Sequence, residues 1–248
     1  MPQTPPRKRR SDIVSPYFSP KKTSDRKTPP SLSGDRLHER LIQLKPCLIQ
    51  ESVADDPWKL LVAVTLLNKT AGKLAIPVFW SIVKAWPTAW ALSQAPEPEI
   101  VTLIRPLGTQ NIRAKRLIDL SRAYLQDPPS LRDQRPSRAV GPPVSPRKRE
   151  KYPPTPISHL PGAGVYALDS YRIFCSGPAS QEWKDVNPSD KVLIRYLKWK
   201  WAVMENKQWK PGSGVIGTAD FPYIEDLISE LERYSTDKDS NAGKCILC

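Results

Sequence analysis

The stretch Leu160-Pro161-Gly162-Ala163-Gly164-Val165 says most about the fold of this chain. It predicts a short helical segment that ends at Leu160, a tight turn with two glycines one residue apart, and a second helix that begins at Val165. Glycine permits the sharp reversal and lets the backbone approach another molecule closely. Backbone N–H groups at the start of the second helix are suited to holding a phosphate. Many helix connections contain two such glycines, but the proline before them and the helix after them indicate a helix–hairpin–helix element.

The rest of the ordered chain also has the spacing of helices. Pro57 stands at a first-turn position directly after Asp56, as is common where a helix begins. Pro77 falls inside a helical pattern, where we expect it in the first turns or at a kink. Convincing strand alternation is absent, so we expect an all-α fold. The predicted helices cover residues 37–44, 57–68, 72–85, 98–104, 111–125, 165–175, 190–204 and 221–234.

Composition narrows the classes of protein. The 248 residues include 38 basic and 25 acidic side chains, for a formal net charge of +13. Such an excess of positive charge favours a polyanionic partner, with nucleic acid the first candidate. The 28 prolines are about twice the usual share and indicate flexible stretches beside an ordered core. The composition excludes collagenous and coiled-coil proteins.

Membrane and metal sites find little support in the sequence. The longest apolar run, residues 60–67, is interrupted by Thr65 and is far too short to span a bilayer. The N-terminus lacks the apolar segment of a secretory signal. The four cysteines are too few and scattered for a disulfide framework, and they lack the spacing of a zinc or iron–sulfur site. We therefore expect a reduced, intracellular protein with no membrane association, metal or cofactor.

Proline and charge divide the chain into segments. Residues 1–34 hold 7 prolines and 8 basic side chains and are predicted to be a disordered tail. Residues 127–156 hold 9 prolines and are interpreted as an insertion within an ordered domain spanning residues 35–210. Residues 211–248 are interpreted as a linker, an acidic amphipathic helix and a flexible end. That helix either packs back on the core or binds a partner.

Basic clusters occur in both proline-rich stretches, namely Arg7-Lys8-Arg9-Arg10 and Arg147-Lys148-Arg149. They are solvated charge runs, non-specific DNA-tethering arms, or signals for a nuclear import receptor. On this pattern we expect a protein of the nucleus. The final Cys245-Ile246-Leu247-Cys248 fits the outline of a prenylation site, but a membrane anchor conflicts with a nuclear location.

Asp169 lies five residues beyond Gly164. From the residues alone, the simplest interpretation is a helix-capping aspartate that accepts from free N–H groups. A functional interpretation places its carboxylate beside a DNA-binding hairpin. There it would stabilise positive charge developing on a sugar, or activate a water molecule.

Further segments occur in the order found in a known family. They include Asp56-Pro57-Trp58-Lys59, Leu67-Asn68-Lys69-Thr70-Ala71-Gly72-Lys73, Arg105-Pro106-Leu107-Gly108, Arg113-Ala114-Lys115, Asp169-Ser170-Tyr171-Arg172-Ile173-Phe174-Cys175 and Glu182-Trp183-Lys184. With the hairpin, they resemble the helix–hairpin–helix DNA glycosylase superfamily. The match narrows to the catalytic domain of the methyl-CpG-binding-domain thymine/uracil mismatch glycosylases. It covers roughly residues 45–205, apart from the insertion.

The resemblance implies a fold and a reaction. The implied fold is two small helical subdomains around a DNA-facing cleft. The implied reaction is hydrolysis of the N-glycosidic bond of thymine or uracil mispaired with guanine in double-stranded DNA, which belongs to base excision repair. The target nucleotide must first leave the stack, at a cost of about a few kcal/mol, and a mispaired base costs less to extrude. We expect a monomer without a cofactor.

The resemblance also assigns the catalytic and phosphate-binding residues. Asp169 occupies the catalytic position, and Gly162, Ala163 and Gly164 form the hairpin turn that holds a phosphate. Tyr166 stands where bifunctional relatives have a Schiff-base lysine. A phenol cannot form that imine, so the implied enzyme is monofunctional, without strand cleavage.

A pocket and a wedge complete the implied site. Gln50 and Tyr124 match residues that contact the flipped pyrimidine, through an amide that donates and accepts and a ring that stacks. Lys69 falls where the family usually has an arginine that fills the vacated stack, and lysine lacks the planar stacking surface. The loop Leu107-Gly108-Thr109 matches the wedge toward the orphaned guanine, with Thr109 in place of a larger apolar residue.

Two alternatives remain open from the sequence. The departures at Lys69 and Thr109 are compatible with a non-catalytic protein that binds mismatched or structured DNA on the same scaffold. A glycosylase for a different damaged base also fits the motifs.

Overall fold

The computed structural model describes residues 34–137 and 152–239, with side chains to Ser235. The basic clusters at residues 7–10 and 147–149 and the four C-terminal residues 245–248 lie outside the described residues. The tail, most of the insertion and the import signals therefore stay predictions.

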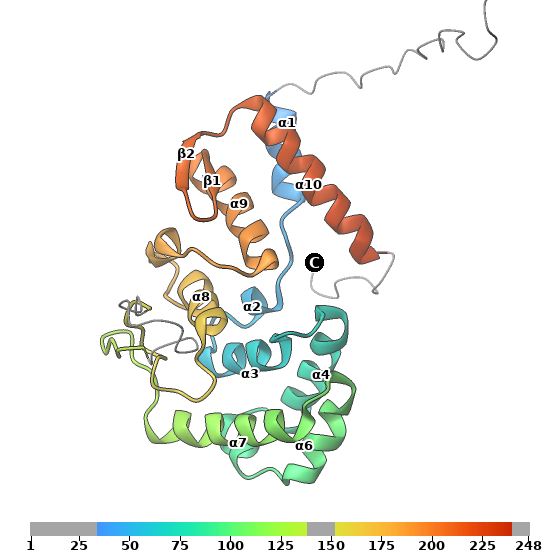
Figure 1. Ribbon diagram of the computed structural model, residues 1–248, viewed down its shortest axis with the longest axis vertical. Coiled ribbons are helices and arrows are strands. Elements are labelled where there is room, and N and C mark those ends of the chain that lie inside the picture. Colours follow the sequence, from blue (N-terminus) through green and yellow to red (C-terminus); the bar gives the residue numbers. More distant parts are fainter. Residues whose placement is uncertain (1–33, 138–151, 240–248) are drawn as a thin grey trace, which may run out of the picture. The chain divides into compact units, whose positions relative to one another are not determined.

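The described chain is mainly helical, which confirms the all-α prediction (Figure 1). The longer helices begin and end within a few residues of their predicted bounds, except α10, which extends further. The α-helices are α1 (Gly34–Gln43), α2 (Ile49–Ser52), α3 (Pro57–Leu67), α4 (Gly72–Ala85), α5 (Ala89–Ser93), α6 (Glu97–Ile104), α7 (Gln110–Gln126), α8 (Val165–Phe174), α9 (Lys191–Glu205) and α10 (Phe221–Asp239). Short 3-10 turns are η2 (Arg105–Leu107) and η3 (Glu182–Asp185).

Side-chain caps explain where two of the central helices begin. The Asp56 carboxylate accepts a hydrogen bond from the N–H of Lys59, and Pro57 occupies the first turn of α3. The Asp190 carboxylate accepts from the first turn of α9. Such caps satisfy N–H groups that have no partner within the helix. Pro77 lies within α4, five residues after its start, in agreement with the prediction.

A first hydrophobic cluster is built around α3, which packs against α4, α7 and α8 (Figure 1). Nearly every side chain of α3 is buried, so this helix has no solvent-exposed face and forms the centre of the cluster. The cluster takes its buried side chains from the segment between α2 and α8, and its members include Leu60, Leu61, Phe79, Leu92, Ile104, Leu117 and Leu168.

A second hydrophobic cluster is formed by α1, α9, α10 and strand β1 (Lys207–Lys210), which follows α9 in the chain. Its members include Leu37, Leu41, Leu193, Leu197, Trp209, Leu227, Ile228 and Leu231. The burial of Leu227 and Leu231 shows that the acidic C-terminal helix packs back on the protein. Tyr166 and Phe174 of α8 pack against both clusters. Two clusters of this kind agree with the two small subdomains expected.

The structure adds elements that the sequence pattern did not predict. Strands β1 (Lys207–Lys210) and β2 (Gly214–Thr218) form an antiparallel hairpin, part of which was assigned to a linker. Gly212 and Gly214 have φ of +79° and +71° at its turn, a region that favours glycine. The segment before Leu160 is a series of turns and not the helix we expected: the N–H of Leu160 donates to the carbonyl of Ile157, three residues back.

The ends of the predicted insertion are joined to each other. Arg135 and Thr155 exchange two backbone hydrogen bonds of 3.1 Å. The Ser137 hydroxyl donates to the carbonyl of Tyr152 at 2.7 Å. We call these four residues the neck. It fixes where the chain leaves and re-enters the described part of the domain.

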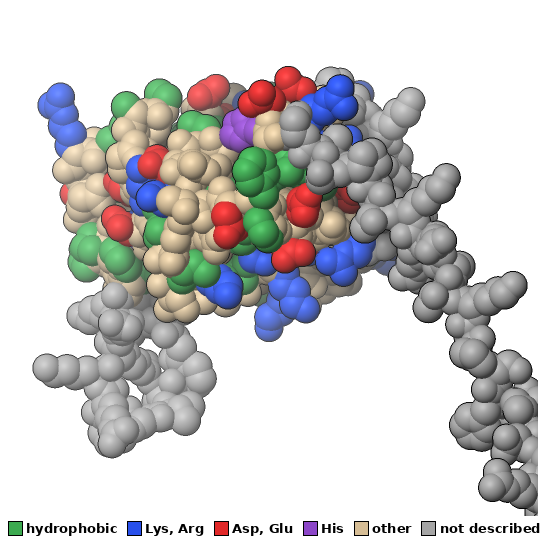
Figure 2. Space-filling view, turned by 90° about the horizontal axis from the view of Figure 1, so that it is seen from above, with side chains coloured by type: hydrophobic (Ala, Val, Ile, Leu, Met, Phe, Trp, Pro, Cys, Tyr) green, Lys and Arg blue, Asp and Glu red, His purple; other side chains and the backbone are tan. Residues whose placement is uncertain are grey.

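The surface toward α1 and α10 shows no single sign of charge. Figure 2 views the protein from above and shows acidic, basic and hydrophobic side chains interspersed on this face. A strong electrostatic field that attracts a polyanion requires charges of one sign to gather, and the described residues of this face do not gather in that way.

Among the described residues, no helix is long and apolar enough to cross a membrane.

Candidate active site

The hairpin turn has the tight geometry that its glycines predict. Gly162 has φ of +86°, and Gly164 is the N-cap of α8. The N–H groups of Ala163 and Gly164 donate within the turn, to Leu160 and Gly162 respectively. Among the described residues, the N–H groups of Val165 and Tyr166 at the start of α8 have no carbonyl to bond within the helix and are suited to holding a phosphate.

A pocket of about 290 Å³ lies against this turn. Asn68, Leu160 and the three hairpin residues line it, and so does Arg116 of α7. The Arg116 side chain lies so near that a Cβ on Gly162 would meet its Cδ at 3.3 Å. A cation beside free N–H groups strengthens an anion site. Sequence reasoning missed Arg116, whose distance from the hairpin along the chain hides the contact.

Asp169 lies inside α8, five residues after the N-cap. The interpretation of Asp169 as a helix cap is therefore wrong, because Gly164 holds that position. Only 2% of the Asp169 surface is exposed. Little of this residue is therefore accessible from solvent in this conformation.

Tyr152 is the direct partner of this carboxylate. Its hydroxyl donates a hydrogen bond of 2.7 Å to Oδ1 of Asp169. Burial raises the pKa of Asp169 to about 6, and the Tyr152 hydrogen bond opposes that rise. The Arg172 guanidinium also lowers the pKa, whereas the charge of Asp190 raises it. The carboxylate is thus ionised at neutral pH.

Arg172 extends the network away from the hairpin. Its guanidinium lies 5.9 Å from the centre of the Tyr152 ring. Its Nε is 3.7 Å from a carboxylate oxygen of Glu182. The motifs include Arg172 but assign it no role, and Tyr152 lies within the predicted insertion, where no site residue was expected.

Gln50 and Tyr166 meet although 116 residues separate them. The Gln50 amide nitrogen donates to the Tyr166 hydroxyl at 2.8 Å. Gln50 lies in α2 and is 2% exposed. Burial raises the pKa of Tyr166, as does Asp190, and the Gln50 hydrogen bond lowers it. The phenol therefore stays neutral and offers no amine for imine chemistry.

Tyr124 is not joined to this pair by any hydrogen bond among the described residues. Burial is the main cause that raises the pKa of Tyr124, and the negative charge of Asp56 raises it further. Cys175 caps the C-terminal end of α8, whereas Tyr166 lies at the N-terminal end. The role of Tyr124 in a base pocket stays a prediction.

The two predicted DNA-facing loops are exposed and conformationally unusual. Lys69 has φ of +57° and Thr109 has φ of +48°, in the left-handed region that residues other than glycine rarely adopt. Gly108 is also exposed, with φ of +71°. Leu107, in contrast, is buried in the first cluster. In this conformation Leu107 anchors the wedge loop, and the exposed part is Gly108 and Thr109.

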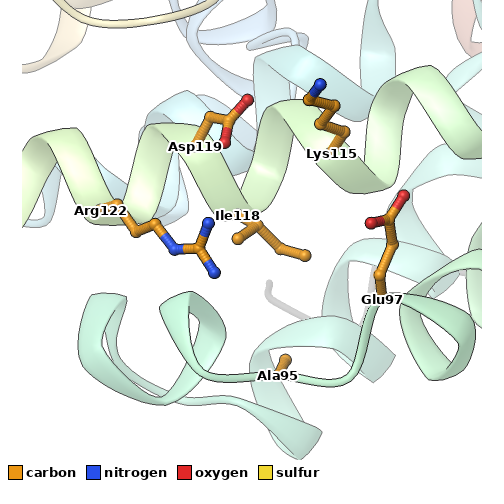
Figure 3. A pocket seen from close by; sticks show the side chains of 6 residues that line it. All are labelled: Ala95, Glu97, Lys115, Ile118, Asp119 and Arg122. Carbon is orange, nitrogen blue, oxygen red and sulfur yellow. The ribbon is translucent and has the colours of Figure 1, made fainter.

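A second pocket, of about 240 Å³, lies between α7 and the segment that leads into α6 (Figure 3). It is lined by two acidic and two basic side chains, with Ile118 and Ala95: Glu97, Asp119, Lys115 and Arg122. No predicted site residue belongs to this lining. Among the described residues, no group of three His, Cys, Asp or Glu could hold a metal ion.

The helical domain that contains the hairpin turn and Asp169 matches a known family. Residues 62–212 match the model for HhH-GPD superfamily base excision DNA repair proteins, and the chain belongs to this superfamily. The resemblance inferred from the motifs is thereby confirmed at the level of the superfamily.

Particular relatives agree with this assignment. The chain is 34% identical over 193 residues to a methyl-CpG-binding domain protein 4-like protein of Arabidopsis thaliana, a match covering 76% of this chain and 35% of the relative. It is 43% identical over 67 residues to a thymine-DNA glycosylase of Aeropyrum pernix, covering 27% of this chain and 30% of the relative. These matches span about a third of the length of the curated relatives.

Solved structures add little to this assignment. The structure of a thermostable thymine-DNA glycosylase aligns with a TM-score of 0.41 and 17% identity, over 81% of this chain and 85% of that chain.

Proposed function

We propose that this protein is a monofunctional DNA glycosylase that removes thymine or uracil mispaired with guanine. The observation that carries the proposal is the buried carboxylate of Asp169. Asp169 lies on α8, the helix that begins at the hairpin turn, and its carboxylate accepts a hydrogen bond from Tyr152. Membership of a base excision repair superfamily supports it.

The proposed reaction uses Asp169 in its ionised form. As the bond between base and sugar breaks, positive charge develops on the deoxyribose, and a nearby carboxylate stabilises it. The same group orients the attacking water and accepts its proton. With a pKa of about 6, Asp169 is ionised at neutral pH yet basic enough to take a proton.

Gln50 is proposed to select the base that is removed. Its amide nitrogen is engaged by Tyr166, and its carbonyl oxygen is the acceptor that it can offer. Thymine and uracil carry an N3–H donor where cytosine has an acceptor, so an amide oxygen favours the first two. Mispairing lowers the cost of extrusion and adds to the selection.

The proposal that the enzyme does not cleave the DNA strand rests on Tyr166. The residue at this position is a neutral phenol hydrogen-bonded to Gln50. It cannot form the imine that precedes β-elimination, so the expected product is an intact strand with an abasic site.

The direct test uses a labelled duplex with one G·T or G·U pair beside a matched duplex, each sample split with and without alkali. Cleavage only after alkali, at the mismatched pyrimidine, supports the proposal. Asp169→Asn is expected to abolish it. Cleavage without alkali contradicts monofunctional chemistry, and competition with duplexes that carry other lesions identifies a different base.

One observation favours the second candidate, a non-catalytic mismatch-binding protein. Asp169 and Gln50 are both 2% exposed, so neither side chain presents much surface to a base in this conformation. Tight mismatch binding without base release from any lesion-bearing duplex would support this candidate.

Nuclear location, an import receptor and a monomeric state are further proposals that rest on sequence. Substitution of the basic residues in 7–10 and 147–149 by alanine, in a fluorescent fusion, tests the first two. Light scattering of the full chain tests the third.

A further inference from the structure

The two exposed loops proposed to enter DNA lie on either side of one buried side chain. Residues 68–70, the first loop, follow α3, and residues 107–109, the second loop, precede α7. Each contains a residue with positive φ, Lys69 or Thr109. Such conformations cost about 1–3 kcal/mol each and persist only where neighbouring groups hold them.

Arg113 of α7 is the group that holds both loops. Its Nε donates to the Thr109 hydroxyl at 3.0 Å. Its Nη2 donates to the Thr70 hydroxyl at 2.7 Å and to the carbonyl of Asn68 at 3.0 Å. One guanidinium thus contacts both ends of the first loop and the second loop at once.

The same guanidinium closes the end of α3. Its Nη1 donates to the carbonyl of Leu66 at 2.6 Å, one of the last carbonyls of the helix, which have no partner within it. A positive charge at a helix C-terminus is also favoured by the helix dipole. This explains how Arg113 stays buried, 8% exposed, with no carboxylate among its hydrogen-bond partners. Burial, then the charge of Arg116, lowers its pKa.

Lysine cannot reproduce this arrangement. The acceptors lie on several sides of a planar group with five N–H donors, whereas an ammonium is a single point with three. The geometry therefore requires arginine and not merely a positive charge.

We propose that Arg113 is a positioning residue that couples the two loops, so that Lys69 and Thr109 enter the duplex as one unit when the target nucleotide leaves the stack. The proposal rests on the proposed function, which assigns these loops to DNA. It differs from a purely structural role in one respect: a structural cap on α3 stabilises the fold without making one loop depend on the other.

Amide hydrogen exchange of the full chain measures this dependence without DNA. Thr109→Val removes the hydroxyl that accepts from Arg113 and keeps the side-chain shape, and Thr70→Val does the same in the first loop. We expect each substitution to speed exchange about tenfold in the opposite loop, since a hydrogen bond to a charged group is lost. Faster exchange confined to the substituted loop would overturn the proposal.

Base extrusion gives the second readout. The duplex carries 2-aminopurine beside a mismatched thymine, and Asp169→Asn in every variant is intended to prevent base release. Arg113→Lys and Thr109→Val are expected to lower the fluorescence gain at saturating protein about fivefold, with affinity for matched duplex kept within about twofold. An equal loss of affinity for both duplexes, or an unchanged gain, contradicts the proposal.

Arg122→Gln is the matched control, because Arg122 is an exposed arginine of the same helix, nine residues beyond Arg113. It should change neither readout. Loss of the fluorescence gain in this control would mean that net charge, and not loop coupling, governs extrusion.

The two proposals fail in distinguishable ways. If the unsubstituted protein releases no base from any mismatch, the proposed function fails, and exchange in the two loops still decides whether Arg113 couples them. If base release occurs but each loop responds only to its own substitution, the inference about Arg113 alone is wrong.

Discussion

Removal of the Tyr152 hydroxyl should move the pH dependence of base release. Tyr152→Phe deletes one oxygen and keeps the ring that packs beside Arg172. The lost hydrogen bond, 2.7 Å from oxygen to oxygen, favours the ionised form of Asp169. Without it the carboxyl becomes a weaker acid, and less of it is ionised at a given pH.

The size of the shift follows from the strength of the bond. A hydrogen bond to a charged group contributes about 1.5–3 kcal/mol, which corresponds to roughly 1–2 pKa units. From a starting pKa of about 6, the variant should titrate near pH 7–8. At pH 6.5 the ionised fraction then falls about 3- to 25-fold, whereas at pH 9 it stays within about 10% of the original. Burial and the charges of Arg172 and Asp190 act on the pKa of Asp169 in both proteins, so they do not contribute to the difference between them.

The assay is single-turnover base release from a G·U duplex at saturating protein, from pH 5 to pH 9, with alkali treatment of each time point. Tyr171→Phe is the matched control, because Tyr171 is another buried tyrosine of this region and makes no contact with the carboxylate among the described hydrogen bonds. Its acid limb should coincide with that of the unsubstituted protein.

Two results would refute this reasoning. An acid limb that stays in place in Tyr152→Phe would mean that the phenol does not stabilise the charged carboxylate. A rate that falls by one factor at every pH would mean that Tyr152 acts on orientation alone.

Three further predictions concern stability and DNA affinity. Because burial raises the pKa of Asp169 to about 6, the ionised carboxylate that is present above this pH lowers the stability of the fold. Asp169→Asn should therefore raise the free energy of unfolding by about 2–3 kcal/mol at pH 8, whereas below pH 4 the variant and the unsubstituted protein should be equally stable in thermal denaturation. Gly162→Ala should cost about 1–3 kcal/mol in thermal denaturation and weaken DNA binding, because φ is +86° and its Cβ would press on Arg116; Gly164→Ala, with ordinary φ and open space around it, should cost less in stability. Leu227→Ala in α10 should cost about 2–5 kcal/mol in denaturant unfolding, and no loss would show that the helix is dispensable for the fold.

The sequence predicted those elements that local rules determine. Asp56 before Pro57 correctly marked the start of α3, and the glycines around Ala163 correctly marked the turn before α8. The bounds of α4 and α7 were predicted nearly to their ends because helical periodicity and flanking glycine and proline act over a few residues.

Contacts between distant segments were out of reach of these rules. Gln50 and Tyr166 were each assigned by resemblance, but their hydrogen bond depends on how α2 meets α8. The Tyr152 partner of Asp169 lies across a segment that proline content marked as an insertion. The strands β1 and β2 are four and five residues long, too short for alternation to show, and burial of Trp209 by α9 supports them more than β propensity does.

The neck gives the molecule a natural graft point. Since Arg135 and Thr155 already bring the two chain ends together, the entropy of closing whatever lies between them grows only with the logarithm of its length, by about 0.6 kcal/mol per doubling. A foreign domain whose own termini lie close together should therefore be tolerated between residues 138 and 151. Because Tyr152 belongs to the neck and touches Asp169, a guest that spreads its termini on binding a ligand should pull on that contact. The release rate would then report the ligand, and the domain would become a biosensor scaffold.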